Sequence, residues 1–107
     1  MANKTLEQEI AKFAYEKVKN SSENDKRNFK KLPALIITNG LIPTLAYYKE
    51  ERNIYEAISD WLKNKKLIEG DALNYLLNSH SETLRRATLE VLKLSEYLKR
   101  FSEIEGE

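Results

Sequence analysis

The chain has 107 residues, of which 33% are charged and 41% hydrophobic, and its formal net charge is +1. A chain of this size holds one hydrophobic core, and this composition is typical of a globular protein rather than a disordered one. The absence of cysteine excludes disulfides and cysteine-ligated metals, and no apolar run approaches the ~20 residues of a membrane span. The N-terminal residues are polar, unlike a secretory signal. We therefore expect one cytoplasmic domain over residues 1–107.

The apolar pattern predicts helices from the first residues onward. Thr5 precedes Gln8 by three residues, which is the spacing of a capping box at a helix start. An apolar stripe at helical spacing then follows: Leu6, Ile10, Phe13, Ala14 and Val18. Residues 20–24 have loop composition and are expected to end this first helix.

A second helical segment is expected to start near Asp25 and to contain Pro33. Because proline lacks an amide hydrogen and clashes with the preceding turn, we expect a kink or a restarted helix there. Asn39 and Gly40 are expected to close the segment, since both residue types tolerate the left-handed conformation of a C-cap. Pro43 is suited to the first turn of the next helix.

Three more helices complete the prediction. Asn53 and Glu56 form an apparent capping pair before a helix that the basic stretch 63–66 ends. Asp71 is expected to cap a short helix, and the last helix is expected from about residue 81 to 104. That helix has a narrow apolar seam: Leu84, Ala87, Val91, Leu94, Leu98 and Phe101. The sequence therefore predicts an all-α, single-domain compact bundle of about five to six helices with a long C-terminal helix.

The sequence offers little that could carry out catalysis. His80 is the one histidine and lies in a predicted turn, whereas a metal site normally requires several ligands at suitable spacing. Gly-rich phosphate loops and nucleophile elbows do not occur. We therefore predict no enzymatic activity, catalytic residue, metal, cofactor or small-molecule ligand.

The aromatic and basic residues leave two interpretations open. Tyrosines beside cations can stack on nucleobases, but they also commonly border a core with the hydroxyl in water, and Trp61 lies within an apolar stripe.

The basic clusters also allow two interpretations. Like charges one turn apart on a helix repel each other, and cations at a helix start oppose the helix dipole. A bound phosphate backbone would reduce both of these unfavourable interactions. Solvated faces explain the same residues without a partner. The clusters are Lys26, Arg27, Lys30 and Lys31, and Arg85 with Arg86.

Two segments resemble a known family. The first reads KKLPALIITNGL at 30–41 and is followed by LAYY at 45–48. The second contains RAT at 86–88 and YLKRF at 97–101. In this order, with an aromatic and aliphatic stretch at 55–62 between them, they resemble the small-subunit family of the type III-B CRISPR (Cmr) effector complex.

The resemblance implies a non-catalytic helical subunit without cofactors that stacks with copies of itself. Its partners would be the backbone and large subunits of the complex, the guide RNA and the target RNA. Target cleavage would belong to the backbone subunit and cyclic-oligonucleotide synthesis to the large one. The residues expected to contact RNA phosphates are Lys30, Lys31, Arg85, Arg86, Lys99 and Arg100, with Lys26 and Arg27 peripheral.

Three alternatives remain at this point. A small DNA-binding regulator would use the turn at residues 39–40, but the helix after it is nearly all apolar or aromatic and would read bases poorly. A helical protein–protein adaptor would leave the basic clusters solvated and have no RNA affinity. A small ribonuclease would depend on His80, for which the sequence provides no acid–base partner.

Overall fold

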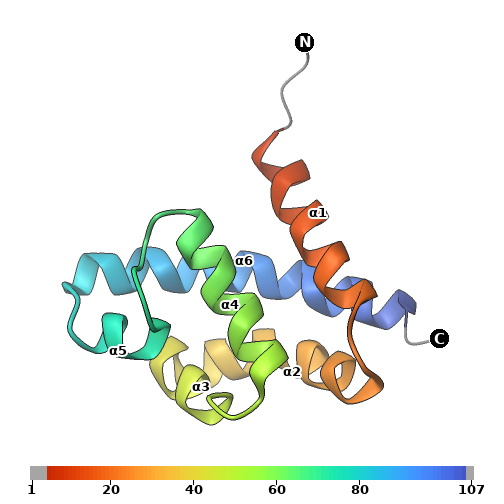
Figure 1. Ribbon diagram of the computed structural model, residues 1–107, viewed down its shortest axis with the longest axis horizontal. Coiled ribbons are helices and arrows are strands. Elements are labelled where there is room, and N and C mark those ends of the chain that lie inside the picture. Colours follow the sequence, from red (N-terminus) through yellow and green to blue (C-terminus); the bar gives the residue numbers. More distant parts are fainter. Residues whose placement is uncertain (1–4, 106–107) are drawn as a thin grey trace.

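The computed structural model describes residues 5–105 and contains six helices and no strand within that range (Figure 1). The helices are α1 (Leu6–Lys19), α2 (Glu23–Asn39), α3 (Leu41–Tyr47), α4 (Arg52–Asn64), α5 (Ala72–Leu77) and α6 (Ser81–Glu105). The predicted all-α class and the long C-terminal helix are both confirmed. None of these helices is long and apolar enough to cross a membrane.

Helix α6 is the longest helix and the one on which most of the others pack. Helix α2 runs antiparallel to it and makes the most extensive contact with it, and α1 and α4 also pack on it (Figure 1). The short helices α3 and α5 pack against each other near the N-terminal end of α6. Among the described residues, no helix covers the side of α6 that faces away from α1, α2 and α4.

Every helix contributes to a single core. One fully buried residue from each is Val18, Phe29, Leu45, Ile58, Leu76 and Leu94, in the order α1 to α6. The predicted seam of α6 is buried at Ala87, Val91, Leu94 and Leu98. Leu67 and Ile68, between α4 and α5, extend the core into a loop. Such burial is the main term that stabilises helices too short to persist alone.

Local capping signals predicted three helix boundaries correctly. Thr5 and Gln8 form the expected capping box at the start of α1. Asp71 accepts the amide hydrogen of Asn74 at 3.0 Å and so caps α5. Gly40 ends α2 with a φ of 92°, a conformation that L side chains adopt only with strain.

Helix α2 differs from the prediction in two respects. It begins at Glu23 rather than near Asp25, because Ser22 and Asp25 form a capping box that the sequence reading missed. It also continues through Pro33, so the alternative of a restarted helix is wrong. Pro33 is buried against the core, and this packing compensates for the one hydrogen bond that proline cannot donate.

The predicted capping pair of Asn53 and Glu56 is wrong. Helix α4 begins at Arg52, and the residue in the capping position, Glu51, makes no capping hydrogen bond through its side chain. Asn53 instead donates its amide hydrogen to Asp25 in α2, at 2.7 Å. A tertiary partner far away in sequence has replaced the local one.

Candidate nucleic-acid interface

The two lysines predicted on α2 lie on its outer side. Phe29 and Leu32 turn into the core, whereas Lys30 and Lys31 are exposed. Within residues 5–105, neither lysine makes an ion pair. Their charges are therefore available to an external anion.

The two peripheral cations of α2 are more constrained. Lys26 Nζ lies 3.7 Å from a carboxylate oxygen of Glu23, and its side chain is only 12% exposed. Arg27 donates a long hydrogen bond of 3.5 Å to the side-chain oxygen of Asn24. These contacts are consistent with a secondary role for both residues.

Two of the predicted cations on α6 have carboxylate partners one turn away. The Arg85 guanidinium donates to both oxygens of Glu82, at 3.2 and 2.7 Å, and holds the pKa of that carboxyl below its usual range. Arg100 lies 3.5 Å from Glu103. Glu82 thus compensates the charge of Arg85 near the helix start, where the sequence suggested an external anion.

Arg86 and Lys99 are exposed and, within the described residues, have no ion-pair partner. Successive helical residues point about 100° apart, so Arg85 and Arg86 lie on different flanks of α6. The same geometry separates Lys30 from Lys31 on the outer side of α2, and the four cations of α6 are spread around and along that helix.

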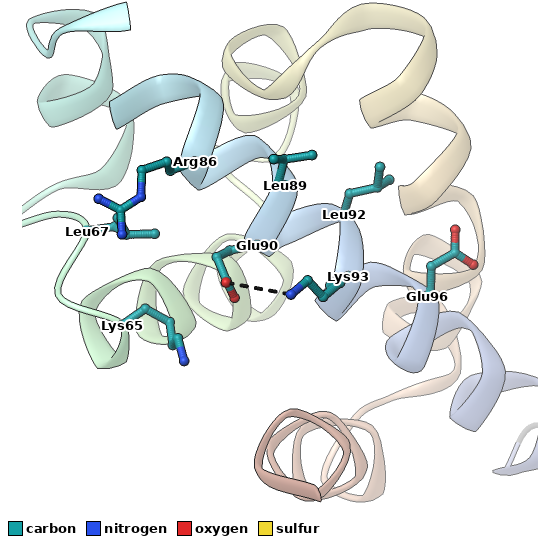
Figure 2. Close-up of a pocket in the computed structure, with 8 residues that line it drawn as sticks. All are labelled: Lys65, Leu67, Arg86, Leu89, Glu90, Leu92, Lys93 and Glu96. Carbon is teal, nitrogen blue, oxygen red and sulfur yellow. Dashed lines mark ion pairs between the residues drawn. The ribbon is translucent and has the colours of Figure 1, made fainter. Parts of the chain in front are cut away.

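Arg86 borders a hollow on the outer face of α6 that the sequence reading did not find (Figure 2). Its volume is about 560 Å³. Leu89 and Leu92 project from α6 and Leu67 from the loop after α4, while charged side chains surround them (Figure 2). The signal in the sequence was Leu89, a leucine that falls outside the buried seam and is 50% exposed.

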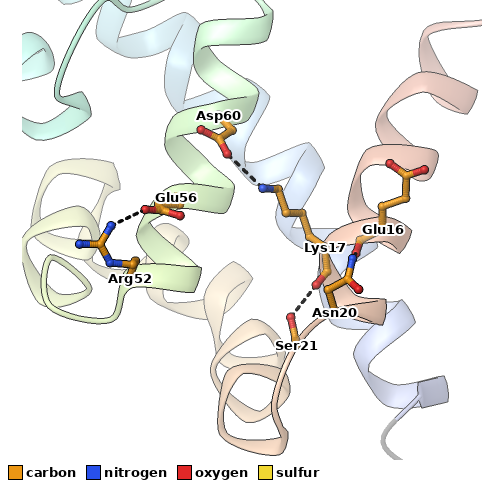
Figure 3. A network of polar contacts seen from close by, with 7 residues as sticks. All are labelled: Glu16, Lys17, Asn20, Ser21, Arg52, Glu56 and Asp60. Carbon is orange, nitrogen blue, oxygen red and sulfur yellow. Dashed lines mark hydrogen bonds and ion pairs between the residues drawn. The ribbon is translucent and has the colours of Figure 1, made fainter.

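Polar contacts also occur between α1 and α4 and along α4 (Figure 3). Lys17 on α1 reaches Asp60 on α4 at 3.0 Å, and Arg52 pairs with Glu56 within α4 at 2.8 Å. Each of these charges has its partner in the same chain. The network is therefore structural and not a second basic surface.

A second polar cluster joins the loop after α3 to the start of α5. Lys49 Nζ lies 2.7 Å from Asp71, and the hydroxyl of Tyr55 donates to the same carboxylate oxygen at 2.8 Å. The Lys49 ammonium, the amide of Asn74 and the Tyr55 hydroxyl together lower the pKa of Asp71 to about 2. The ionised carboxylate of Asp71 thus links the start of α5 to the loop after α3 and to the first turn of α4.

Comparison with known proteins decides the family. A family model described as CRISPR-associated protein (Cas_Cmr5) matches residues 6–105. The chain belongs to this family. It is thus a CRISPR-associated subunit of the Cmr complex, as the resemblance of its two segments implied. A search of curated proteins found no match.

The aromatic residues of this Cmr subunit mostly belong to the core. Trp61 is 3% exposed and donates from its indole nitrogen to Glu90 at 3.1 Å, which confirms its expected buried position. Tyr48 is fully buried, and burial raises the pKa of its hydroxyl to about 12. Its neighbour Tyr47 is 70% exposed, so the adjacent tyrosines point in different directions as expected. Among these three residues, Tyr47 alone could stack on a base.

His80 is exposed and directly precedes α6, as predicted for a turn residue. Within residues 5–105, no group of three or more histidine, aspartate or glutamate side chains could hold a metal ion. The described part of this Cmr subunit thus offers His80 no metal-ligand cluster.

Proposed function

We propose that this protein is the non-catalytic small subunit of a cytoplasmic type III-B Cmr ribonucleoprotein. It would stack along the complex, contact the backbone and large subunits, and support pairing of the guide RNA with the target RNA in antiviral defence. The observation that carries the proposal is the family match over residues 6–105, which spans all six helices.

The charge distribution supports an RNA contact through phosphates alone. When base pairing between guide and target reads the sequence, a neighbouring protein needs only to recognise backbone and shape. Lysine and arginine without base-reading machinery are sufficient for that task. Four of the six proposed residues are suited to it, because they are exposed and have no ion pair within residues 5–105: Lys30, Lys31, Arg86 and Lys99.

The contacts of the six proposed RNA-binding residues support an order among them. Lys30, Lys31, Arg86 and Lys99 come first because each is exposed and, within residues 5–105, has no ion-pair partner. Arg85 and Arg100 rank lower because each would have to share its charge with a glutamate of α6. In this proposal, Lys26 and Arg27 contribute mainly to the local potential.

The test uses the assembled complex with guide RNA and a labelled target RNA. Reversing both charges, Lys30→Glu with Lys31→Glu, should weaken target affinity by roughly tenfold or more at low salt and reduce its salt dependence, because phosphate contacts are lost. A matched control reverses two exposed cations of α1, Lys12→Glu with Lys19→Glu, and should change the affinity less than about twofold. Equal affinities for all three complexes would refute the RNA role.

The hollow on α6 favours one second candidate, a protein–protein adaptor without RNA affinity, because exposed leucines in a concave surface are typical of a protein contact. That candidate predicts that complexes with either charge-reversal variant bind target RNA like the wild-type complex.

The DNA-binding alternative loses support because α3, which follows the turn at Gly40, has only seven residues and buries Leu41, Thr44 and Leu45.

A further inference from the structure

The outer side of α6 carries a second seam, opposite the buried one. Its residues recur at alternating intervals of four and three: Glu82, Arg86, Leu89, Lys93, Glu96, Arg100 and Glu103. This spacing places them in one line along a helix. All of them are exposed except Glu103, which is half-buried. We call this line the outer seam.

The charges of the outer seam are complementary to those of a second α6 placed antiparallel to the first. Glu82 and Arg100 lie nine residues before and after Val91, and they have opposite charges. Arg86 and Glu96 lie five residues before and after it, and they also have opposite charges. An identical helix placed antiparallel across Val91 would therefore meet an opposite charge at each of these four positions.

We infer that two copies of this protein pair through the outer seam of α6, antiparallel about a two-fold axis at the level of Val91. Such an interface is isologous, so every contact occurs twice. Each Arg86 faces the partner's Glu96, and each Glu82 faces the partner's Arg100. Leu89 and Lys93, two residues on either side of the axis, form the centre.

Arg86 and Glu96 are the decisive pair, because neither has an ion-pair partner among the residues that the structure describes. Glu82 and Arg100 already have local partners, Arg85 at 2.7 Å and Glu103 at 3.5 Å, and so gain less from pairing. Exposed ion pairs are individually weak and are screened by salt. The dimer is therefore expected to be weak and to dissociate as the salt concentration rises.

The hollow on α6 gives the pairing a hydrophobic centre. Leu89 is 50% exposed, and the hollow of about 560 Å³ is lined by Leu92 and Lys93 of the same helix (Figure 2). In the dimer, Leu89 of each copy enters the hollow of the other, beside Leu92 and the aliphatic stem of Lys93, as a knob enters a hole. A second copy is favoured over an unrelated helix because the reversed charge order matches α6 itself.

The pairing has a consequence that rests on the proposed function. Arg86 and Arg100 belong both to the outer seam and to the proposed RNA-binding residues. A self-paired subunit would cover these two arginines and leave Lys30 and Lys31 exposed. Target RNA would then compete with a second copy for the outer seam.

The test measures the mass of the free protein by sedimentation at low salt. The wild type should approach twice the 12.5 kDa of one chain as its concentration increases. Arg86→Glu and Glu96→Arg should each stay monomeric alone, because each places two pairs of like charges across the axis. An equimolar mixture of the two variants should dimerise again, because both cross-axis pairs then regain opposite charges.

Two controls make the result specific. Lys12→Glu, a reversal on the exposed side of α1, should dimerise like the wild type, and circular dichroism should show every variant folded. A wild type that stays monomeric up to about 1 mM would overturn the inference. So would a mixture no more dimeric than its components. Neither result bears on RNA affinity, which is tested separately through Lys30 and Lys31.

Discussion

Asn53 in the first turn of α4 donates a hydrogen bond of 2.7 Å to the carboxylate of Asp25 in the first turn of α2. Asp25 is 6% exposed and also accepts the backbone amide hydrogen of Ser22, at 3.2 Å, within the capping box of its own helix. One carboxylate therefore both starts α2 and ties it to α4. The position of the lysines further along α2 depends on this link.

Replacing either residue should destabilise the fold. Asn53→Ala leaves the buried carboxylate oxygen with one donor, the Ser22 amide, in place of two, and Asp25→Ala removes both the tertiary bond and half of the capping box. We expect a loss of about 1–3 kcal/mol in the free energy of unfolding for each variant, measured by urea denaturation. The double variant should lose less than the sum of the two, because the residues share one interaction.

Asn24→Ala is the matched control for these variants. Asn24 lies in the same turn of α2, but its side chain is exposed and accepts only a long bond from Arg27. Its replacement should change the free energy of unfolding by less than about 0.5 kcal/mol. Additive losses for Asp25→Ala and Asn53→Ala would show that the two side chains do not interact in solution.

Asp71 should contribute to the acid sensitivity of the protein. Lys49, Asn74 and Tyr55 hold the pKa of Asp71 at about 2, below its ordinary value of 3.8. A lowered carboxyl pKa stabilises the folded state at pH values above the unfolded pKa, and this contribution is lost as the pH falls from about 4 to about 2. The carboxylate side chain is 39% exposed, so solvent reduces the contribution to the order of 1 kcal/mol.

The measurement compares the wild type with Asp71→Asn across this pH range. Asparagine retains the ability to cap α5 but cannot ionise. The difference in unfolding free energy between the two proteins should therefore be largest near neutral pH and shrink towards pH ~2. A constant difference over the whole range would mean that the charge of Asp71 makes no contribution.

Trp61 should matter for its indole N–H as well as for its size. It packs on Phe13 with ring centroids 5.0 Å apart and donates to Glu90 at 3.1 Å. Trp61→Phe keeps a ring but leaves Glu90 without its donor and should cost about 1–3 kcal/mol. Trp61→Ala, which also opens a cavity, should cost about 3–5 kcal/mol. A loss below about 0.5 kcal/mol for Trp61→Phe, with circular dichroism as the measurement, would contradict a role for the hydrogen bond.

His80→Ala should have little effect. The side chain is exposed, and the contact that His80 makes at the start of α6 uses its backbone carbonyl oxygen, which accepts from Leu84. The free energy of unfolding should change by less than about 0.5 kcal/mol. In our proposal the subunit does not cleave RNA, so target cleavage by the assembled complex should proceed at the wild-type rate. A slower rate at unchanged stability would revive the ribonuclease alternative.

Features that depend on neighbours in sequence could be predicted, and features that depend on tertiary contacts could not. The cap of Thr5 and Gln8 and the cap at Asp71 involve residues three apart, so their patterns are visible in the sequence. Asn53 showed the same kind of pattern, but its partner lies 28 residues away in α2. Pro33 suggested an interrupted helix because its burial against the core could not be read from local sequence.

Two contacts of the proposed RNA-binding residues were visible in the sequence and were missed. Glu82 lies three residues before Arg85 and Glu103 three residues after Arg100, so the predicted last helix already placed each carboxylate beside its cation. The sequence reading also grouped Arg85 with Arg86, which helical geometry separates. The hollow at Leu89 depends on Leu67 from the loop after α4, a contact that no periodicity in α6 reveals.

The most direct test of the central claim is to purify the subunit gently from its own cell and to identify the proteins and RNA that accompany it. Our account predicts larger CRISPR subunits together with guide RNAs that have repeat-derived ends. Recovery of the protein free of RNA and of larger subunits would contradict a role within the Cmr ribonucleoprotein.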